Sequence, residues 1–343
     1  MYVTPRPDVQ EDPLYAVRLG LTGMLAFAAI PILNPALPPI IAALPLGLIA
    51  AQRKAFNPGK VLAAPVVMIV MVYAMTWFVE QLRPMPLVYV GSMWLIYFAA
   101  FRMILKTGAP LGMLIIIVAL LMSIMGMHGT ATLETMRDGF AQASLVAFVI
   151  GPLVYLLLPA RTRERHVDEP IPTDGRIETG AAIRATVLLG LSFWLYAVMQ
   201  PSDMMMAMVA AMVLVFPTGR RVWDEAFQRV RATLYGAAIA LIVLWLFTFS
   251  QHLPIVLGLI FLSGLFLGSK MLSGPHPSMV YQYAFSVVLA LVAGALSTQD
   301  PAYASFTRIV LTMAGAFTAA FCVAMLDSLT KWRGNPLVTT APS

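Results

Sequence analysis

Residues 216–240 read FPTGRRVWDEAFQRVRATLYGAAIA and join two apolar segments of the chain through a basic stretch. The stretch contains Arg220, Arg221, Arg229 and Arg231, and the segments on either side of it are apolar. Loops rich in Lys and Arg stay on the cytoplasmic side of a membrane and so fix the orientation of a multi-pass protein. The stretch therefore predicts a charged cytoplasmic bend between two membrane-spanning segments.

The composition of the whole chain agrees with this interpretation. Its 343 residues are 60% hydrophobic and 11% charged, whereas a soluble domain carries about 25% charged residues. The apolar runs are longer than the alternating strands of roughly ten residues in membrane β-barrels, so helices are the expected spanning form. The net charge of +6 fits basic cytoplasmic loops, because the basic residues form no stripe typical of nucleic-acid binding. We therefore predict an all-α integral membrane protein.

Spanning helices need about 20 predominantly apolar residues, and the chain offers twelve candidate segments. The second and the eighth are the shortest and the least certain to span fully. The twelve segments are 15–33, 38–52, 61–80, 86–104, 109–127, 139–158, 181–199, 203–217, 231–250, 253–269, 278–296 and 304–327.

Basic residues gather in every second bend between these segments. The opposite bends hold only Arg83, Arg137 and Arg308, so the positive-inside rule places both termini in the cytoplasm. The two ends, Met1–Pro13 and Lys331–Ser343, are predicted to be short disordered tails, and the first lacks the features of a signal peptide. The basic bends contain Arg53, Lys54 and Lys60; Arg102 and Lys106; Arg161, Arg163, Arg165 and Arg176; Arg220, Arg221, Arg229 and Arg231; and Lys270.

A polar linker, residues 160–180, divides the chain into two halves of six segments, 1–159 and 181–330, followed by the tail 331–343. The halves are weakly similar, and an even number of spans in each makes such repeats parallel, as in many transporters. Three anchors carry the similarity at an offset of 166 or 167 residues. They are Arg18 with Arg184, Arg53-Lys54 with Arg220-Arg221, and Gly108 with Gly274.

Signatures of catalysis are missing from the sequence. There is no H-E-x-x-H, G-x-S-x-G or P-loop pattern, and the four histidines lie far apart. The single cysteine, Cys322, lies in an apolar run and can form no disulfide within the chain. We expect a protein that is not an enzyme and that has no catalytic residues, metal site or cofactor.

Two arginines inside apolar segments are candidates for substrate binding. Arg18 and Arg184 occupy matching positions near the starts of the first and seventh segments. A cation at the bilayer centre costs roughly 2.5–3.5 kcal/mol even on a lenient scale, so such a residue usually has a function. The two could attract an anionic substrate. Alternatively, both side chains snorkel to the headgroups and only set the topology.

Glycine- and proline-containing elements open the fifth and eleventh segments at matching positions. They read Thr107-Gly108-Ala109-Pro110 and Ser273-Gly274-Pro275-His276-Pro277-Ser278, and Lys106 and Lys270 stand just before them. A helix N-terminus presents free N–H groups to an anion, and His276 can change its charge near neutral pH. Ordinary helix initiation, in which proline favours the first turn, explains the same pattern.

Carboxylates suited to proton coupling are few. Asp203 follows Pro201 at the start of the eighth segment, and Asp138 lies beside Arg137. Prolines also crowd the second segment, and a broken helix exposes backbone groups that need a protein-lined or watery cavity. We predict proton coupling through Asp203 and Asp138, with solvation near an outer bend as the alternative.

From Gln228 the chain reads QRVRATLYGAAIA, which resembles the signature of the fusaric acid resistance family, also called aromatic acid exporters. The matching residues are Arg229, Thr233 and Gly236, with Ala232 where the family commonly has glycine. The first half does not keep this spacing. We expect the three residues to serve close helix packing at the cytoplasmic face.

This resemblance implies an inner-membrane efflux pump of Gram-negative bacteria for aromatic carboxylates or related drugs. Such pumps work with a periplasmic adaptor of the membrane-fusion type and an outer-membrane channel. Longer members carry a large cytoplasmic domain between their halves, where this chain has only residues 160–180. The chain therefore resembles a short branch of the family. Any regulation or oligomer contact that longer members make through that domain is in doubt for this chain. A homo-oligomer stays open.

The leading hypothesis is an exporter of organic anions that is driven by the proton gradient. Its anion-attracting cytoplasmic vestibule would be shaped by Arg18, Arg184, Lys106, Lys270 and His276. Three alternatives stay open: a transporter of the major facilitator type, a passive anion channel similar to plant malate channels, and a membrane scaffold or assembly protein of an envelope complex. The basic bend AAQRKAFNPGK lacks the Asp-Arg pair that the major facilitator fold carries there.

Overall fold

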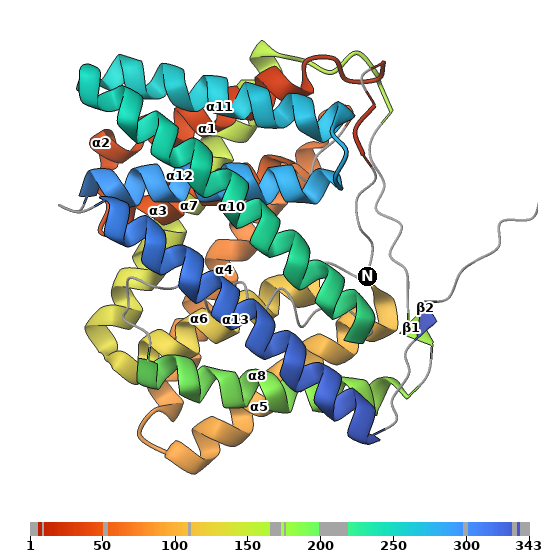
Figure 1. Ribbon diagram of the computed structural model, residues 1–343. Coiled ribbons are helices and arrows are strands. Elements are labelled where there is room, and N and C mark those ends of the chain that lie inside the picture. The colour runs from red at the N-terminus through yellow and green to blue at the C-terminus, as the bar shows by residue number, and fades with distance from the viewer. Residues whose placement is uncertain are drawn as a thin grey trace, which may run out of the picture.

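The structure is a computed structural model that describes residues 6–8, 10–50, 54–108, 111–164, 173–174, 176–198, 219–297, 301–330 and 335–336. These residues form helices and one short two-stranded β-ladder (Figure 1). The helices are α1 (Tyr15–Ala28), α2 (Ile30–Leu33), α3 (Pro38–Ala50), α4 (Pro58–Leu82), α5 (Pro86–Thr107), α6 (Leu111–His128), α7 (Thr130–Leu157), α8 (Ile177–Val198), α10 (Gly219–Phe249), α11 (Leu253–Ser273), α12 (Ser278–Ser297) and α13 (Pro301–Thr330).

Nine helices of the described chain are long and apolar enough to cross a membrane, with α1 and α2 counted as one. The prediction of an all-α membrane protein is thereby confirmed. Two further apolar helices are shorter, α3 and the Met313–Ser328 part of α13. Every predicted segment with described residues coincides with a helix, whereas the eighth, 203–217, lies outside the described residues.

The helix limits follow from local chemistry. Asn57 caps α4 by accepting a hydrogen bond from the backbone N–H of Lys60 at 3.4 Å, and prolines stand in the first turns of α4 and α5. Gly108 ends α5 in the left-handed conformation, with φ of 69°, where a side chain would be strained. Asn34 ends α2 in the same region and separates it from α3.

The basic stretch after Thr218 is not a bend, contrary to the prediction. α10 begins at Gly219 and continues through all four arginines to Phe249. Its 31 residues make a rod of about 46 Å at 1.5 Å per residue, longer than the roughly 30 Å of hydrocarbon. The stretch is polar but contains neither proline nor an internal glycine before Gly236, so the helix continues into its polar part.

One other prediction needs correction. Asp12 is buried and ion-paired, so residues 6–8 and 10–13 do not form the predicted disordered tail. This polar segment gains contacts with distant parts of the chain, which composition alone does not reveal. Near the other end of the chain, β2 (Asn335–Pro336) pairs antiparallel with β1 (Thr173–Asp174).

α6 and α12 form the interior of the bundle. They are the most thoroughly buried of the nine candidate spans, and each follows one of the glycine- and proline-containing elements. Around them, α1 packs on α11, α5 on α8, α4 on α7, and α10 on both α12 and α13. In Figure 1, α10 and α13 run diagonally across the front, from upper left to lower right.

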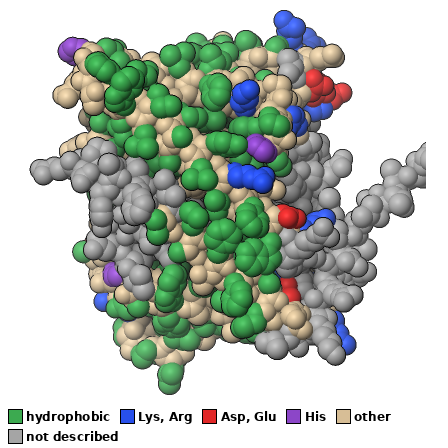
Figure 2. Space-filling view, viewed as in Figure 1, with side chains coloured by type: hydrophobic (Ala, Val, Ile, Leu, Met, Phe, Trp, Pro, Cys, Tyr) green, Lys and Arg blue, Asp and Glu red, His purple; other side chains and the backbone are tan. Residues whose placement is uncertain are grey.

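Small residues permit the closest of these contacts. A side chain at Gly20 of α1 would lie 2.8 Å from the carbonyl oxygen of Phe261 in α11. Small residues at helix contacts let backbones approach closely in membranes, where no hydrophobic force draws helices together. The outer surface, in contrast, keeps large apolar side chains such as Leu87 and Leu156, which are 88% and 80% exposed. Figure 2 shows how hydrophobic side chains cover much of one face, as a lipid-facing surface requires.

One end of the bundle gathers the polar segments, and we refer to it as the polar end. There Lys54 Nζ lies 3.3 Å from Glu11 Oε1 and 3.1 Å from Glu164 Oε2, and the backbone N–H of Ala55 donates to the Glu164 carbonyl at 3.0 Å. The hydrogen bond that Lys54 donates to Glu164 raises the pKa of Lys54, with a smaller contribution from Glu11. The N-terminal segment, the chain after α3 and the linker between the halves thus meet at this end.

Candidate anion site and buried ion pairs

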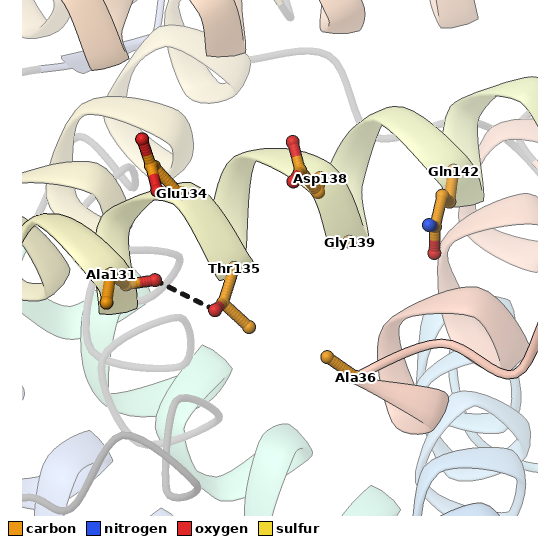
Figure 3. Close-up of a pocket in the computed structure, with 7 residues that line it drawn as sticks. All are labelled: Ala36, Ala131, Glu134, Thr135, Asp138, Gly139 and Gln142. Carbon is orange, nitrogen blue, oxygen red and sulfur yellow. Dashed lines mark hydrogen bonds between the residues drawn. The ribbon is translucent and has the colours of Figure 1, made fainter.

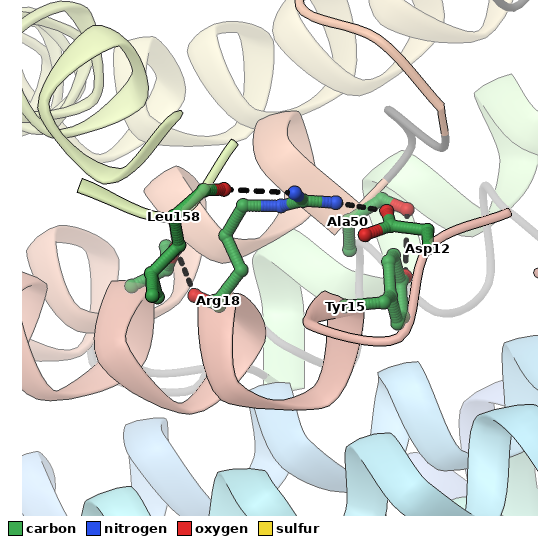
Figure 4. A network of polar contacts seen from close by, with 6 residues as sticks. Asp12, Tyr15, Arg18, Ala50 and Leu158 are labelled. Atoms are coloured by element: carbon green, nitrogen blue, oxygen red, sulfur yellow. Dashed lines mark hydrogen bonds and ion pairs between the residues drawn. The ribbon is translucent and has the colours of Figure 1, made fainter. Parts of the chain in front are cut away.

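Arg18 lies inside the bundle with only 2% of its surface exposed. It forms an ion pair with Asp12, and its Nη1 donates to the Leu158 carbonyl at 3.1 Å (Figure 4). The guanidinium carbon also lies 4.3 Å from the centre of the Tyr155 ring, a cation–π contact. The side chain therefore does not snorkel to the headgroups. It is held by one carboxylate, one carbonyl and one aromatic face.

The Asp12 carboxylate comes from the segment that precedes α1 and is 2% exposed. One of its oxygens pairs with Arg18, while Oδ1 has no hydrogen-bond partner among the described residues. Burial raises the pKa of Asp12, because the desolvation of the carboxylate outweighs the attraction of Arg18. Next to it, the hydroxyl of Tyr15 donates to the Ala50 carbonyl at 3.1 Å and ties the start of α1 to the end of α3.

Arg184 is fully buried at the corresponding place in the second half. Its Nη2 lies 3.6 Å from Asp327 Oδ2 on α13, and its Nη1 donates to the Gly180 carbonyl at 3.1 Å within α8. Asp327 is 9% exposed, and neither of its oxygens has a hydrogen-bond partner in the part of the chain described. Arg18 and Arg184 are thus both buried beside carboxylates, but on different elements.

A third buried ion pair involves the motif that resembles the family signature. Arg229 Nε donates to Glu225 Oε1 at 2.8 Å one turn earlier in α10, and its guanidinium stacks on the Tyr283 ring at 3.2 Å. Both charged side chains are at most 7% exposed. The hydroxyl of Thr233 donates to the Arg229 carbonyl at 2.9 Å.

Gly236 continues the same face of α10 against α12. A side chain there would lie 2.5 Å from the Ala284 carbonyl oxygen and 2.7 Å from Val287 Cβ. Because real side chains do not approach so closely, the two helices can be in contact only with glycine at this position. Arg229, Thr233 and Gly236 therefore lie at a close helix contact, as expected from the sequence.

The other predicted vestibule residues lie apart from Arg18 and Arg184. Lys106 and Lys270 are exposed in the last turns of α5 and α11, where cations favour the helix dipole. His276 is half-buried, with Nε2 3.2 Å from the Tyr235 hydroxyl, and its carbonyl accepts a hydrogen bond from Arg6 Nη2 at 2.7 Å. The structure does not bring the five predicted residues together around one cavity of the described chain.

Asp138 lines a pocket of about 350 Å³ at the surface of α7 (Figure 3). Its Oδ1 accepts from Arg137 Nε at 2.8 Å, and the side chain is 52% exposed. Asp203, the other predicted coupling residue, lies outside the described residues. The pocket is lined by Ala36, Ala131, Glu134, Thr135, Asp138, Gly139 and Gln142.

Comparison with known families supports one of the sequence-based interpretations. Residues 191–322 match the family model described as fusaric acid resistance protein-like. This part of the chain is fusaric acid resistance protein-like. The match contains Arg229, Thr233 and Gly236 and the helices α10, α11 and α12, and it includes neither Arg18 nor Arg184. No curated protein and no solved structure compared with the chain matches it.

Residues important to the buried pairs were missed by the sequence analysis. Asp12 lies in the predicted disordered tail. Glu225 lies in the predicted basic bend and Tyr155 in an apolar segment, and no sequence pattern distinguishes either residue. Asp327, which lies just beyond the matched residues 191–322, could have been found as the one acidic residue of the last apolar segment. An acidic residue in such a segment is expected to have a buried cationic partner.

Proposed function

We propose that this multi-pass membrane protein exports organic anions, with aromatic carboxylates as the main class of substrate. The observation that carries the proposal is Arg18, a buried cation stacked on the Tyr155 ring at 4.3 Å. A guanidinium in this setting binds a carboxylate strongly, and apolar surroundings with an aromatic wall suit the ring of the same ligand. The fusaric acid resistance protein-like match over residues 191–322 supports export of this class.

We propose that the two halves are parallel six-helix repeats that the polar linker, residues 160–180, joins. The packing pattern supports this, because exchanging the halves converts several helix pairs into other observed pairs. α1 on α11 becomes α8 on α5, and α4 on α7 becomes α10 on α13. Repeats of this kind let a transporter expose a central site to each side in turn, as one half moves against the other.

The polar end is proposed to face the cytoplasm of a bacterium, in the inner membrane, with both termini on that side. In support, the N-terminal segment, the linker and β2 of the C-terminal tail make contacts with one another or with the same loops. Lys54 follows α3, and Arg102 and Lys106 lie in the last turns of α5. The positive-inside rule assigns these basic residues to this side.

Coupling to the proton gradient, through Asp138 and Asp203, remains part of the proposal. We also propose that Lys106, Lys270 and His276 attract anions. The protein is further proposed to work with a periplasmic adaptor of the membrane-fusion type and an outer-membrane channel. Asp138 is open to solvent and lines a pocket, which is what a proton-exchanging carboxylate needs. We expect Asp138→Asn to reduce gradient-driven transport without removing substrate binding.

Transport is tested with the full chain in liposomes. Terephthalate is the suitable probe, because its two carboxylates prevent the passage of a neutral acid through the lipid. We expect accumulation above the equilibrium level when a pH gradient is imposed, and none in protein-free liposomes. Equilibration without accumulation would indicate a passive anion channel instead. The absence of flux under every gradient would contradict transport and favour a scaffold.

A further inference from the structure

The carboxylate that faces Arg18 belongs to a short segment outside the helical bundle. This segment, residues 6–8 and 10–14, is called the N-terminal strap here. It runs across the polar end, where Arg6 contacts the loop before α12 and Glu11 contacts Lys54. The strap places Asp12 on Arg18, which also donates to the Leu158 carbonyl (Figure 4). The Tyr155 ring lies on the same guanidinium. The buried cation is thus neutralised by a carboxylate from a segment that lies outside the helices.

Most of the strap's other polar contacts are weak. The Glu11 and Lys54 side chains are 39% and 28% exposed, and the Arg6 contact is also open to solvent. Ion pairs at such exposed positions contribute little, because water competes for both charges. Only Pro7 and Asp12 are buried among the described strap residues. The docking of the strap therefore depends largely on the ion pair between Asp12 and Arg18.

Arg18 in turn depends on a negative partner. A buried cation that loses its carboxylate is strongly destabilised unless another anion or water replaces it. The other buried arginines have carboxylates fixed by helices, Asp327 on α13 for Arg184 and Glu225 on the same helix for Arg229. Among these three, only the partner of Arg18 comes from a segment that lies outside the helices. Exchange of one carboxylate for another is thus easiest at Arg18.

We propose that Arg18 and Tyr155 form a carboxylate-binding site in which Asp12 of the N-terminal strap is the resident occupant, and that an aromatic carboxylate binds by displacing Asp12. The inference rests on the proposed function and specifies its binding site. The incoming carboxylate takes the position of Asp12 on the guanidinium, and its ring lies along the apolar wall that includes Tyr155. The strap then acts as an internal competitor that is released when substrate enters.

Binding of terephthalate to the detergent-purified full chain tests the competition. Asp12→Asn removes the charge of the competitor and preserves its shape, so we expect this variant to bind terephthalate about tenfold more tightly than the native chain. Terephthalamide, the uncharged analogue, should show no such difference. Glu11→Gln is the matched control on the same strap, and it should bind like the native chain. Equal affinities of Asp12→Asn and the native chain would overturn the proposal.

Displacement of the strap is measured separately. With Cys322 replaced by serine, a cysteine introduced at the buried position Pro7 reports the release of the strap through its rate of maleimide labelling. We expect terephthalate to increase this rate, and the increase to disappear when Arg18→Gln is added. A labelling rate that ignores terephthalate would contradict the displacement, even if binding is retained.

The two proposals can fail independently. If terephthalate binds, and binds more tightly to Asp12→Asn, but the liposomes show no flux, then the site is correct and the transport function is wrong. If flux is present but neither the affinity nor the labelling rate depends on Asp12, then transport is correct and Asp12 is not the resident occupant. Binding and labelling need no gradient, so they do not depend on the coupling mechanism.

Discussion

Arg18 and Arg184 lie near the starts of α1 and α8, yet their surroundings differ. Arg184 faces Asp327, which a 30-residue helix holds in position, and the pair lies entirely within the bundle. Arg18 faces Asp12, which is held by a short strap with exposed contacts. A carboxylate fixed on a helix can only stabilise the fold, whereas one on a strap can also be exchanged. The difference suggests that the second-half pair is structural and the first-half pair functional.

The largest effect is expected from Asp327→Asn. It leaves Arg184 buried without a charged partner, and breaking a buried pair in this way costs about 3–5 kcal/mol. Thermal unfolding in detergent should show a strong loss of stability, and adding Arg184→Met should recover most of it. If Asp327→Asn is as stable as the native chain, then the ion pair between Arg184 and Asp327 does not stabilise the fold.

A smaller loss is expected from crowding the close contact in the same half. Gly236→Ala places a side chain 2.5 Å from the Ala284 carbonyl, and such overpacking costs about 1–3 kcal/mol. Gly190→Ala on α8 is the matched control, since a side chain there meets nothing within 4 Å. The control should unfold at the native temperature or above it. Equal unfolding temperatures for both variants would contradict the tight α10–α12 contact.

Asp12→Asn should cost less than about 1 kcal/mol in the same unfolding experiment. Release of the strap opens Arg18 to water, so its charge is compensated as at an exposed site, where ion pairs contribute little. Comparison with Asp327→Asn tests the asymmetry directly, because the two substitutions are chemically identical. Equal losses of stability in the two variants would show that both carboxylates are structural.

Much of the fold could be predicted because its cause lies along the chain. Apolar runs of spanning length predicted every described helix, since each satisfies its own backbone hydrogen bonds. The error at 219–230 has the opposite origin, because polarity says where a membrane ends but not where a helix ends. The segment around Asp12 was also misjudged, since a polar composition cannot reveal that one carboxylate is buried against a distant arginine.

The sequence by itself determined the membrane class, the helices and the motif of Arg229, Thr233 and Gly236, because these depend on local composition and spacing. Only the tertiary structure decided which carboxylate faces each arginine. Asp12 and Asp327 reach their partners through the packing of the bundle, and the energy of a buried charge depends on that placement and not on the position of a residue along the chain.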